Sequence, residues 1–258
     1  MCRPDFFDIE YEINPWMKKS NQVNQELAEK QWLQIHDIYN TLGIDVERIA
    51  PVDGLPDMVF TANGGMVIDG RVALPRFLNP ERQGETTKFD DWFRANGFEE
   101  TILPKNNFEG EGDCLFAQDT LFAGHGFRSD IKSHPELADF FGKEVVSLHL
   151  VNPSFYHLDT CFCPLNDEVV MYFPGAFDQD SQAVISKRFK TVIEASPRDA
   201  AAFGLNAVPI GKNVVLSNQA TGLHQQLKEH GLNPITTPIT EFHKSGGGVK
   251  CLTLELRS

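Results

Sequence analysis

The chain has 258 residues, of which 41% are hydrophobic and 23% charged, as in an ordinary globular protein with a buried core. Its 23 basic and 36 acidic residues give a net charge of −13, which argues against a general binder of nucleic acid or of an anionic membrane, because both partners are polyanions. Five cysteines, no secretory signal and no apolar run of transmembrane length lead us to expect a reduced, cytoplasmic protein.

A pattern of helix, glycine and strand begins near the N-terminus. The first helix is predicted from apolar residues that step by four, three, four and three positions and so share one helix face, namely Ala28, Trp32, Ile35, Tyr39 and Leu42. Gly43 follows as a candidate C-cap, and residues 44–49 then alternate between apolar and polar as in a half-buried strand.

The same order recurs along the chain. Helical patterns end at Gly97, Gly142 and Gly231, and each glycine precedes a predicted strand, at residues 101–103, 145–148 and 235–237. A further helix is predicted over residues 183–189, where no glycine follows. Five units in 258 residues are about 52 residues each, which suggests a closed array around an axis. The alternation is also compatible with an open α/β sheet.

The first segment with chemical potential is near the C-terminus. Three glycines, Gly246–Gly248, precede Cys251 and a predicted strand, so that a cysteine stands between a flexible loop and a rigid element. Such a cysteine suits a nucleophile. The alternative is a buried cysteine that acts as a small hydrophobic side chain.

The second segment is residues 155–163. In a strand, His157, Asp159 and Cys161 would point to one face, and a histidine beside a carboxylate suits proton transfer and cation binding. A zinc site from His157, Cys161 and Cys163 is the alternative, although these spacings match no standard zinc pattern.

The third segment is residues 108–116, in which Glu109, Glu111 and Asp113 stand among glycines. A solvated turn and a divalent-cation loop are the simpler interpretations, but a calcium loop needs more oxygen ligands at regular spacing. The fourth segment, residues 55–65, reads as an apolar strand that ends at Asn63 before two glycines, which alone indicates a hairpin. Arg82 and Arg128 are isolated arginines, which are usually solvated.

Together these segments resemble the guanidine-modifying enzymes, which include arginine deiminases, dimethylarginine dimethylaminohydrolases, amidinotransferases and bacterial arginine dihydrolases. The resemblance covers nearly the whole chain, in the same order, and is carried by the Cys-Arg-Pro start, residues 11–17 (which look like the family's first strand), Asp57–Asn63, Phe108–Asp113, His157–Asp159 and Gly246–Cys251. It implies a five-fold pseudosymmetric α/β propeller, the pentein fold, with repeated ββαβ-type units in one catalytic domain over residues 1–258.

The resemblance also implies a mechanism. Cys251, as thiolate, would attack the guanidinium carbon, and His157 would protonate the departing ammonia and then activate a water. Asp159 and a glutamate of the third segment would hold the guanidinium nitrogens. Register favours Glu109 for this glutamate, but one extra residue in the motif leaves Glu111 open.

Further site residues follow from the same resemblance. Arg82 and Arg128 look like the pair that binds the substrate α-carboxylate, which implies an amino acid such as arginine rather than agmatine, and Asn14 would reach the substrate. Asn63 stands where deiminases and dimethylarginine hydrolases typically carry aspartate. A neutral amide can donate to a ureido oxygen as well as accept, as in the arginine dihydrolases.

These features lead us to expect an arginine dihydrolase that converts arginine into ornithine, ammonia and carbon dioxide. The alternatives are a single hydrolysis of arginine or methylated arginine to citrulline, an amidinotransferase and, from another class, a non-catalytic propeller that binds a partner. No metal or organic cofactor is implied, and the expected partner is a small guanidino amino acid. An oligomer is compatible with the sequence.

Overall fold

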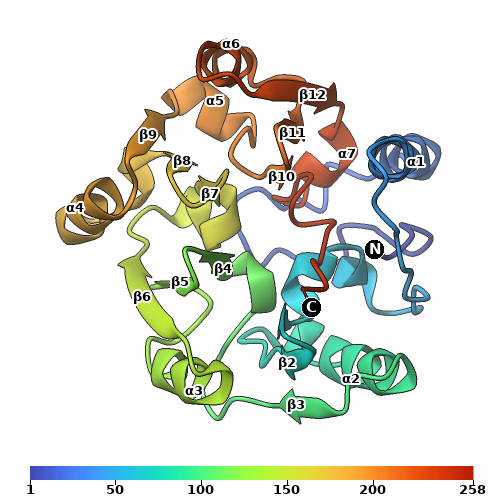
Figure 1. The fold of residues 1–258 in the computed structure, drawn as a ribbon. Helices are drawn as coiled ribbons and strands as arrows, with labels where there is room; N and C mark the ends of the chain where they lie inside the picture. Colours follow the sequence, from blue (N-terminus) through green and yellow to red (C-terminus); the bar gives the residue numbers. More distant parts are fainter. Residues whose placement is uncertain (258) are drawn as a thin grey trace.

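Five structural units surround a central axis in the computed structural model, which describes residues 1–257 (Figure 1). Four of them follow the predicted order of strand, strand, helix and strand. These units are β1 (Met66–Ile68), β2 (Arg71–Ala73), α2 (Glu85–Ala95) and β3 (Glu100–Ile102); β4 (Cys114–Ala117), β5 (Thr120–His125), α3 (Ser133–Phe141) and β6 (Glu144–His149); β7 (Phe162–Pro164), β8 (Val169–Tyr172), α4 (Gln179–Arg188) and β9 (Thr191–Glu194); and β10 (Val208–Ile210), β11 (Asn213–Ser217), α6 (Thr221–Glu229) and β12 (Asn233–Thr237).

Each of these units is a three-stranded sheet with one topology. The first two strands pair antiparallel, and the third pairs parallel to the second. A parallel pair needs a crossover connection, which the helix of each unit supplies. Figure 1 shows β4, β7 and β10 near the centre and the helices toward the rim, so the segment before each first strand reaches the axis.

Segments from both ends of the chain build the fifth unit. Its helix is α1 (Gln25–Thr41), and a parallel bridge joins Cys2 to Ile49. The C-terminal segment contacts the first unit where Ala62 N–H donates to Cys251 O over 3.0 Å. Two short helices, α5 (Pro197–Ala201) and α7 (Thr240–His243), complete the regular structure. The ring is therefore closed by contacts between segments far apart in sequence.

The five predicted helices are confirmed. In α1, Ala28, Trp32, Ile35 and Tyr39 are all buried, and the Asn24 side chain caps the helix by accepting from Leu27 N–H over 3.0 Å. The four glycines expected after helices all have positive φ, at which a side chain would be strained: Gly43, Gly97, Gly142 and Gly231. As predicted, α4 ends without a glycine. Among residues 1–257, no helix has the length and apolar character needed to cross a membrane.

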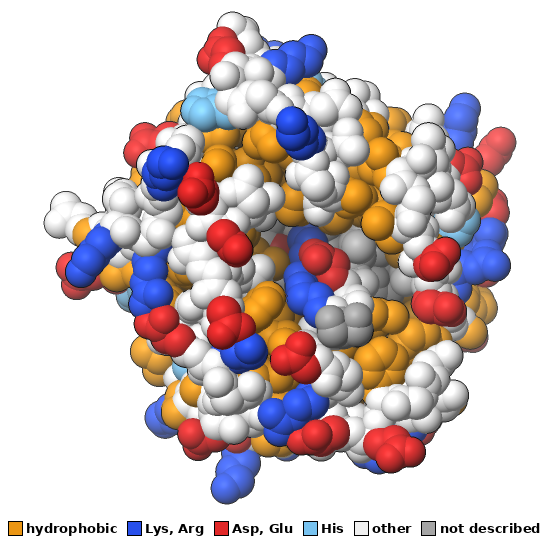
Figure 2. Space-filling view, in the orientation of Figure 1, with side chains coloured by type: hydrophobic (Ala, Val, Ile, Leu, Met, Phe, Trp, Pro, Cys, Tyr) orange, Lys and Arg blue, Asp and Glu red, His pale blue; other side chains and the backbone are white. Residues whose placement is uncertain are grey.

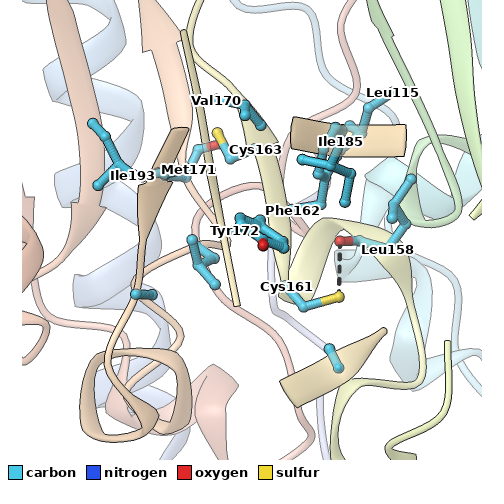
Figure 3. Close-up of a cluster of buried hydrophobic side chains, with 14 of the residues drawn as sticks. Leu115, Leu158, Cys161, Phe162, Cys163, Val170, Met171, Tyr172, Ile185 and Ile193 are labelled. Atoms are coloured by element: carbon cyan, nitrogen blue, oxygen red, sulfur yellow. Dashed lines mark hydrogen bonds between the residues drawn. The ribbon is translucent and has the colours of Figure 1, made fainter. Parts of the chain in front are cut away.

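A large apolar cluster fills the space between the central strands and their helices (Figure 3). Ile185 of α4 lies in this cluster with Phe162 of β7 and Met171 of β8. The Phe162 ring also contacts Phe122 of the neighbouring unit at a centroid distance of 5.4 Å, so these two units share the cluster. All five cysteines are free and buried; the Cys161 thiol, for example, donates to Leu158 O over 3.5 Å.

Several predicted strands are wrong, and most of these errors fall near the axis. Residues 11–17 contain no strand, and residues 44–49 contribute only the bridge at Ile49. Residues 56–64 form two 3₁₀ turns, Pro56–Val59 and Thr61–Gly64, residues 158–160 form another, and Cys251 lies in a turn with no strand after it. His157 and Asp159 therefore do not alternate along a strand. Backbone hydrogen bonds within the turns, such as Asn63 N to Phe60 O and Thr160 N to His157 O, take the place of a sheet ladder.

Candidate active site

Five turns, one from each unit, meet at the axis, and hydrogen bonds join neighbouring turns in a ring. Neighbouring turns are linked by Asn63 Nδ2 to Glu109 O (2.9 Å), Leu158 N to Asp113 Oδ1 (3.1 Å), Asn206 Nδ2 to Asp159 O (3.1 Å), Cys251 N to Asn206 Oδ1 (3.0 Å) and Ala62 N to Cys251 O (3.0 Å). The ring brings residues from all five units within reach of one small volume.

Cys251 is buried, and its sulfur has two polar side-chain contacts. Sγ lies 3.2 Å from Asp159 Oδ2 and 3.1 Å from Asn206 Nδ2, which donates to it. Burial, together with the adjacent Asp159 carboxylate, raises the pKa of Cys251, and burial raises the pKa of Asp159 to about 7. In the unliganded site, the group is therefore a neutral thiol that donates to the carboxylate. A cation that enters the site would favour the thiolate.

His157 is held by a buried carboxylate. Its Nε2 lies 2.7 Å from Glu109 Oε2, which also accepts from Arg128 Nη1 over 3.1 Å. Burial alone would raise the pKa of Glu109, but the Arg128 guanidinium and the His157 hydrogen bond lower it to about 2. Glu109 is therefore ionised, and its carboxylate fixes the orientation of the imidazole through the hydrogen bond to Nε2. The structure thus places Glu109 against His157.

Both predicted arginines are buried, but they differ in how many donors remain. Arg82 binds Glu85 through two nitrogens, each at 2.8 Å, and donates to Asn63 Oδ1 over 2.9 Å and to Asp57 O over 3.3 Å. One of its five N–H groups is then uncommitted. Among residues 1–257, Arg128 donates to Glu109 Oε2 and, over 2.9 Å, to Ile13 O, which leaves three of its N–H groups without a partner there. Arg128 is therefore better placed to receive a carboxylate.

A small pocket lies over these groups. Its walls include six residues that the sequence indicated: Asn14, Asn63, Arg82, Arg128, His157 and Cys251. Asp57 Oδ1 and Ser245 Oγ, in two further wall residues, are buried without a hydrogen-bond partner in the described part of the chain. A larger apolar groove between α1, the first unit and β10 is lined by none of the predicted site residues, so the small pocket is the better candidate for the active site.

Glu109 and Asp159 bond wall residues of this pocket but are not wall residues themselves. Glu111 is not a wall residue either, in contrast to its prediction as a substrate contact. Its carboxylate accepts from Lys250 Nζ over 2.6 Å and from Glu255 N over 3.0 Å, and it also pairs with Arg257. This cluster satisfies the carboxylate, which therefore lies apart from the His157 and Glu109 pair. On the face shown in Figure 2, acidic and basic side chains lie together near the centre.

A family model described as N,N dimethylarginine dimethylhydrolase, eukaryotic, matches residues 3–258. The chain belongs to this family. It is 43% identical over 256 residues to the N(G),N(G)-dimethylarginine dimethylaminohydrolase of Mycobacterium tuberculosis, across 99% of this chain and 84% of that enzyme. The expected membership of the guanidine-modifying, pentein-fold superfamily is thereby confirmed.

A second group of relatives is longer than this member of the dimethylarginine dimethylhydrolase family. The chain is 44% identical over 263 residues to the bifunctional arginine dihydrolase/ornithine cyclodeaminase ArgZ of Synechocystis, across 99% of this chain but 37% of ArgZ. A crystal structure of the N-terminal domain of ArgZ, bound to product, superposes with a TM-score of 0.94 at 43% identity, covering 98% of this chain and 95% of that domain. The same domain with an asparagine-to-serine substitution has been crystallised covalently bound to a reaction intermediate.

Sequence reasoning gave no role to three polar residues of this family member's site. Glu85 pairs with Arg82, Asp57 lines the pocket although it was noted only as the first residue of a motif, and Asn206 contacts the Cys251 sulfur. A signal for Asn206 exists in the spacing, because the axial residues Asn63, Glu111, Asp159, Asn206 and Cys251 are 48, 48, 47 and 45 positions apart. Within residues 1–257, no group of three or more histidine, cysteine or acidic side chains is arranged to hold a metal, and the zinc alternative has no support there.

Proposed function

We propose that the chain is the catalytic domain of an arginine dihydrolase, which converts arginine and two waters into ornithine, two ammonia and carbon dioxide. The observation that carries this proposal is the Asn63 amide in the wall of a pocket that also contains Cys251 and His157. An amide at this point suits both a cationic guanidinium and a neutral ureido group. The sequence and structural similarity to ArgZ supports the same reaction.

The first hydrolysis uses the contacts around Cys251. Asp159 Oδ2, 3.2 Å from the sulfur, accepts the thiol proton, and Asp159 Oδ1, which has no partner among the described residues, remains for a guanidinium nitrogen. The thiolate forms a bond to the guanidinium carbon, and a carbon–nitrogen bond breaks as His157 protonates the leaving ammonia. His157 then takes a proton from water, whose oxygen bonds to the carbon. The carbon–sulfur bond breaks, citrulline forms, and the sulfur regains its proton from Asp159.

The second hydrolysis begins from citrulline, which carries no charge on its ureido group. Asn63 Oδ1 accepts from Arg82, and Nδ2 donates one hydrogen to Glu109 O, so the second Nδ2 hydrogen remains for a ureido oxygen. The Cys251 thiolate attacks the ureido carbon, and a carbon–nitrogen bond breaks as His157 protonates the leaving ammonia, which leaves an S-carbamoyl cysteine. Water, deprotonated by His157, then bonds to the carbon, and the carbon–sulfur bond breaks. The released carbamate of ornithine loses carbon dioxide when its carbon–nitrogen bond breaks, which yields ornithine. An aspartate at position 63 would lack the Nδ2–H donor.

Product analysis tests the proposal. The chain, incubated with arginine, should yield ornithine and two equivalents of ammonia, and Cys251→Ser should yield neither. Citrulline as the sole stable product would contradict two hydrolyses. Asn63→Asp should slow the conversion of citrulline at least tenfold more than the conversion of arginine. The reason is that the neutral ureido oxygen of citrulline then loses the hydrogen bond that Asn63 Nδ2–H would donate to it. Asn218→Asp, at an exposed position, is the matched control.

A single hydrolysis of a methylated arginine is the second candidate. The match to the dimethylarginine family model and to the M. tuberculosis enzyme favours it. The two activities separate when N,N-dimethylarginine is the substrate, because this reaction would release dimethylamine and citrulline. A higher kcat/KM for dimethylarginine than for arginine, with no ornithine, would favour this candidate over the dihydrolase.

A further inference from the structure

Asn206 is a buried polar residue between Asp159 and Cys251, and the mechanism above gives it no role. It lies two residues before β10, in the turn of the fourth ββαβ unit, and its side chain is fully buried. A buried amide must satisfy its polar atoms within the protein, because it cannot exchange them with water.

All its side-chain contacts have a defined direction. Oδ1 accepts from Cys251 N over 3.0 Å, and Nδ2 donates to Asp159 O over 3.1 Å and to Cys251 Sγ over 3.1 Å. The amide cannot be reversed, because Nδ2 would then face an N–H donor and Oδ1 would face a carbonyl. The two hydrogens of Nδ2 are thus directed to a backbone oxygen and to the sulfur.

Among residues 1–257, Asn206 Nδ2 is the one side-chain donor to the sulfur, and the Gly248 backbone N–H is a second donor that, like Asn206, acts to lower the pKa of Cys251. The Asp159 carboxylate, at 3.2 Å, accepts from a thiol but repels a thiolate. When the thiol proton leaves, the Asn206 N–H remains directed at the resulting negative charge. A hydrogen bond to a charged group is stronger than one to a neutral group.

We propose that Asn206 is a catalytic residue whose Nδ2–H stabilises the Cys251 thiolate. This inference deepens the proposed function and rests on its cysteine chemistry. The sulfur donates an electron pair to carbon when the carbon–sulfur bond forms and recovers it when that bond breaks. Asn206 therefore stabilises the nucleophile before attack and the leaving thiolate after each hydrolysis, while its Oδ1 holds the Cys251 backbone in place.

The surroundings of Asn206 fix this geometry. A Cβ atom at Gly248 would lie 2.8 Å from Asn206 Oδ1, so a side chain there would displace the amide. Asn206 O also accepts from Lys250 N over 3.3 Å, which ties the same residue to the turn that contains Cys251. The last glycine of the Gly246–Gly248 run thus makes room for Asn206 beside the nucleophile.

The experiment measures the alkylation of Cys251 by iodoacetamide as a function of pH, because this reaction reports the thiolate without requiring turnover. The variants are Asn206→Ala, which removes the amide, and Asn206→Asp, which is nearly isosteric and keeps the acceptor for Cys251 N. Cys251→Ser gives the background from the four other cysteines, and Asn218→Asp is the matched control at an exposed asparagine. Thermal unfolding and kcat and KM for arginine are measured on each protein.

Both Asn206 variants should move the alkylation profile to higher pH by about one unit or more and lower kcat about tenfold or more, with a smaller change in KM. An alkylation profile of Asn206→Ala that coincides with the original, even with a lowered melting temperature, would overturn the proposal in favour of a structural role. A shift of the alkylation profile in Asn206→Asp but not in Asn206→Ala would also overturn the proposal, because repulsion between the new carboxylate and the thiolate would explain that result. If the unsubstituted chain alkylates at Cys251 but turns over no guanidine, the proposed function fails while the shift between variants still supports the Asn206 assignment.

Discussion

Glu109→Gln tests whether an ionised carboxylate fixes His157. The substitution keeps the shape of the side chain but removes the charge that Arg128 and His157 share, at 3.1 and 2.7 Å. The carboxylate is fully buried, so its charge interactions are poorly screened by water. We expect the variant to lose both stability and activity, and the pH dependence of the stability loss separates the charge from other effects.

The magnitude follows from the pKa of Glu109, which is lowered in the folded chain from 4.5 to about 2. At 1.36 kcal/mol per pKa unit, this lowering corresponds to about 3 kcal/mol of unfolding free energy at neutral pH. Because the folded pKa lies below the unfolded one, the contribution is present above pH 4.5 and is lost as the pH falls toward 2. About 2 kcal/mol of it should be gone by pH 3.

Urea denaturation of the two proteins between pH 3 and 7 measures this difference. The stability gap between the original chain and Glu109→Gln should be largest near neutral pH and should narrow steadily below pH 5. An exposed control, Glu168→Gln, should show no such pH-dependent gap. A gap that stays constant, or one that widens as the pH falls, would refute the assignment of an ionised Glu109. In the same variant kcat should fall by about a hundredfold or more, since His157 loses its orienting partner.

Three further substitutions test other parts of the site. Lys250→Met leaves Glu111 buried with only Arg257 as a cationic partner. The substitution should lower the unfolding free energy measured in urea by about 3 kcal/mol. The control Lys190→Met, which breaks the exposed ion pair with Glu168, should have little effect. Gly112→Ala places a methyl group against Asn63 Nδ2, and should raise the citrulline-to-ornithine ratio; an unchanged ratio would contradict the role of Asn63. Arg128→Lys should raise KM for arginine about tenfold or more but leave agmatine, which has no carboxylate, less affected; equal losses for both substrates would exclude a carboxylate contact.

The repeated architecture could be predicted because it depends on local signals. Apolar spacing identified the five helices, and glycines at the helix ends identified four of the boundaries, since both follow from backbone geometry within one unit. The ββαβ order and the closed ring agree with the structure. The fifth unit was harder to predict, because α1 and Cys251 belong to the same unit but stand at opposite ends of the sequence.

The axial segments were predicted as strands from the apolar stretch that ends at Asn63, from the resemblance at residues 11–17 and from the one face that His157, Asp159 and Cys161 would share in a strand. In the structure residues 158–160 form a 3₁₀ turn, in which Leu158 and Asp159 are both buried, as His157 is beside it. Hydrogen bonds between turns, such as Asn206 to Asp159, replace the ladder of a sheet. No local sequence signal describes these contacts, because their partners are about 45 residues or more apart.

The two glutamates of one motif show why register alone could not assign the site. Glu109 and Glu111 are two positions apart in a single turn, but one carboxylate bonds His157 and the other bonds Lys250. Lys250 directly precedes Cys251, so the Glu111 ion pair joins the second turn to the turn of Cys251, while Asn206 holds the same turn from the fourth unit. Cys251 is therefore fixed from two directions by residues that do not line the small pocket. A ring of five similar turns can thus supply several different chemical roles, because each role depends on which neighbouring turn a side chain meets.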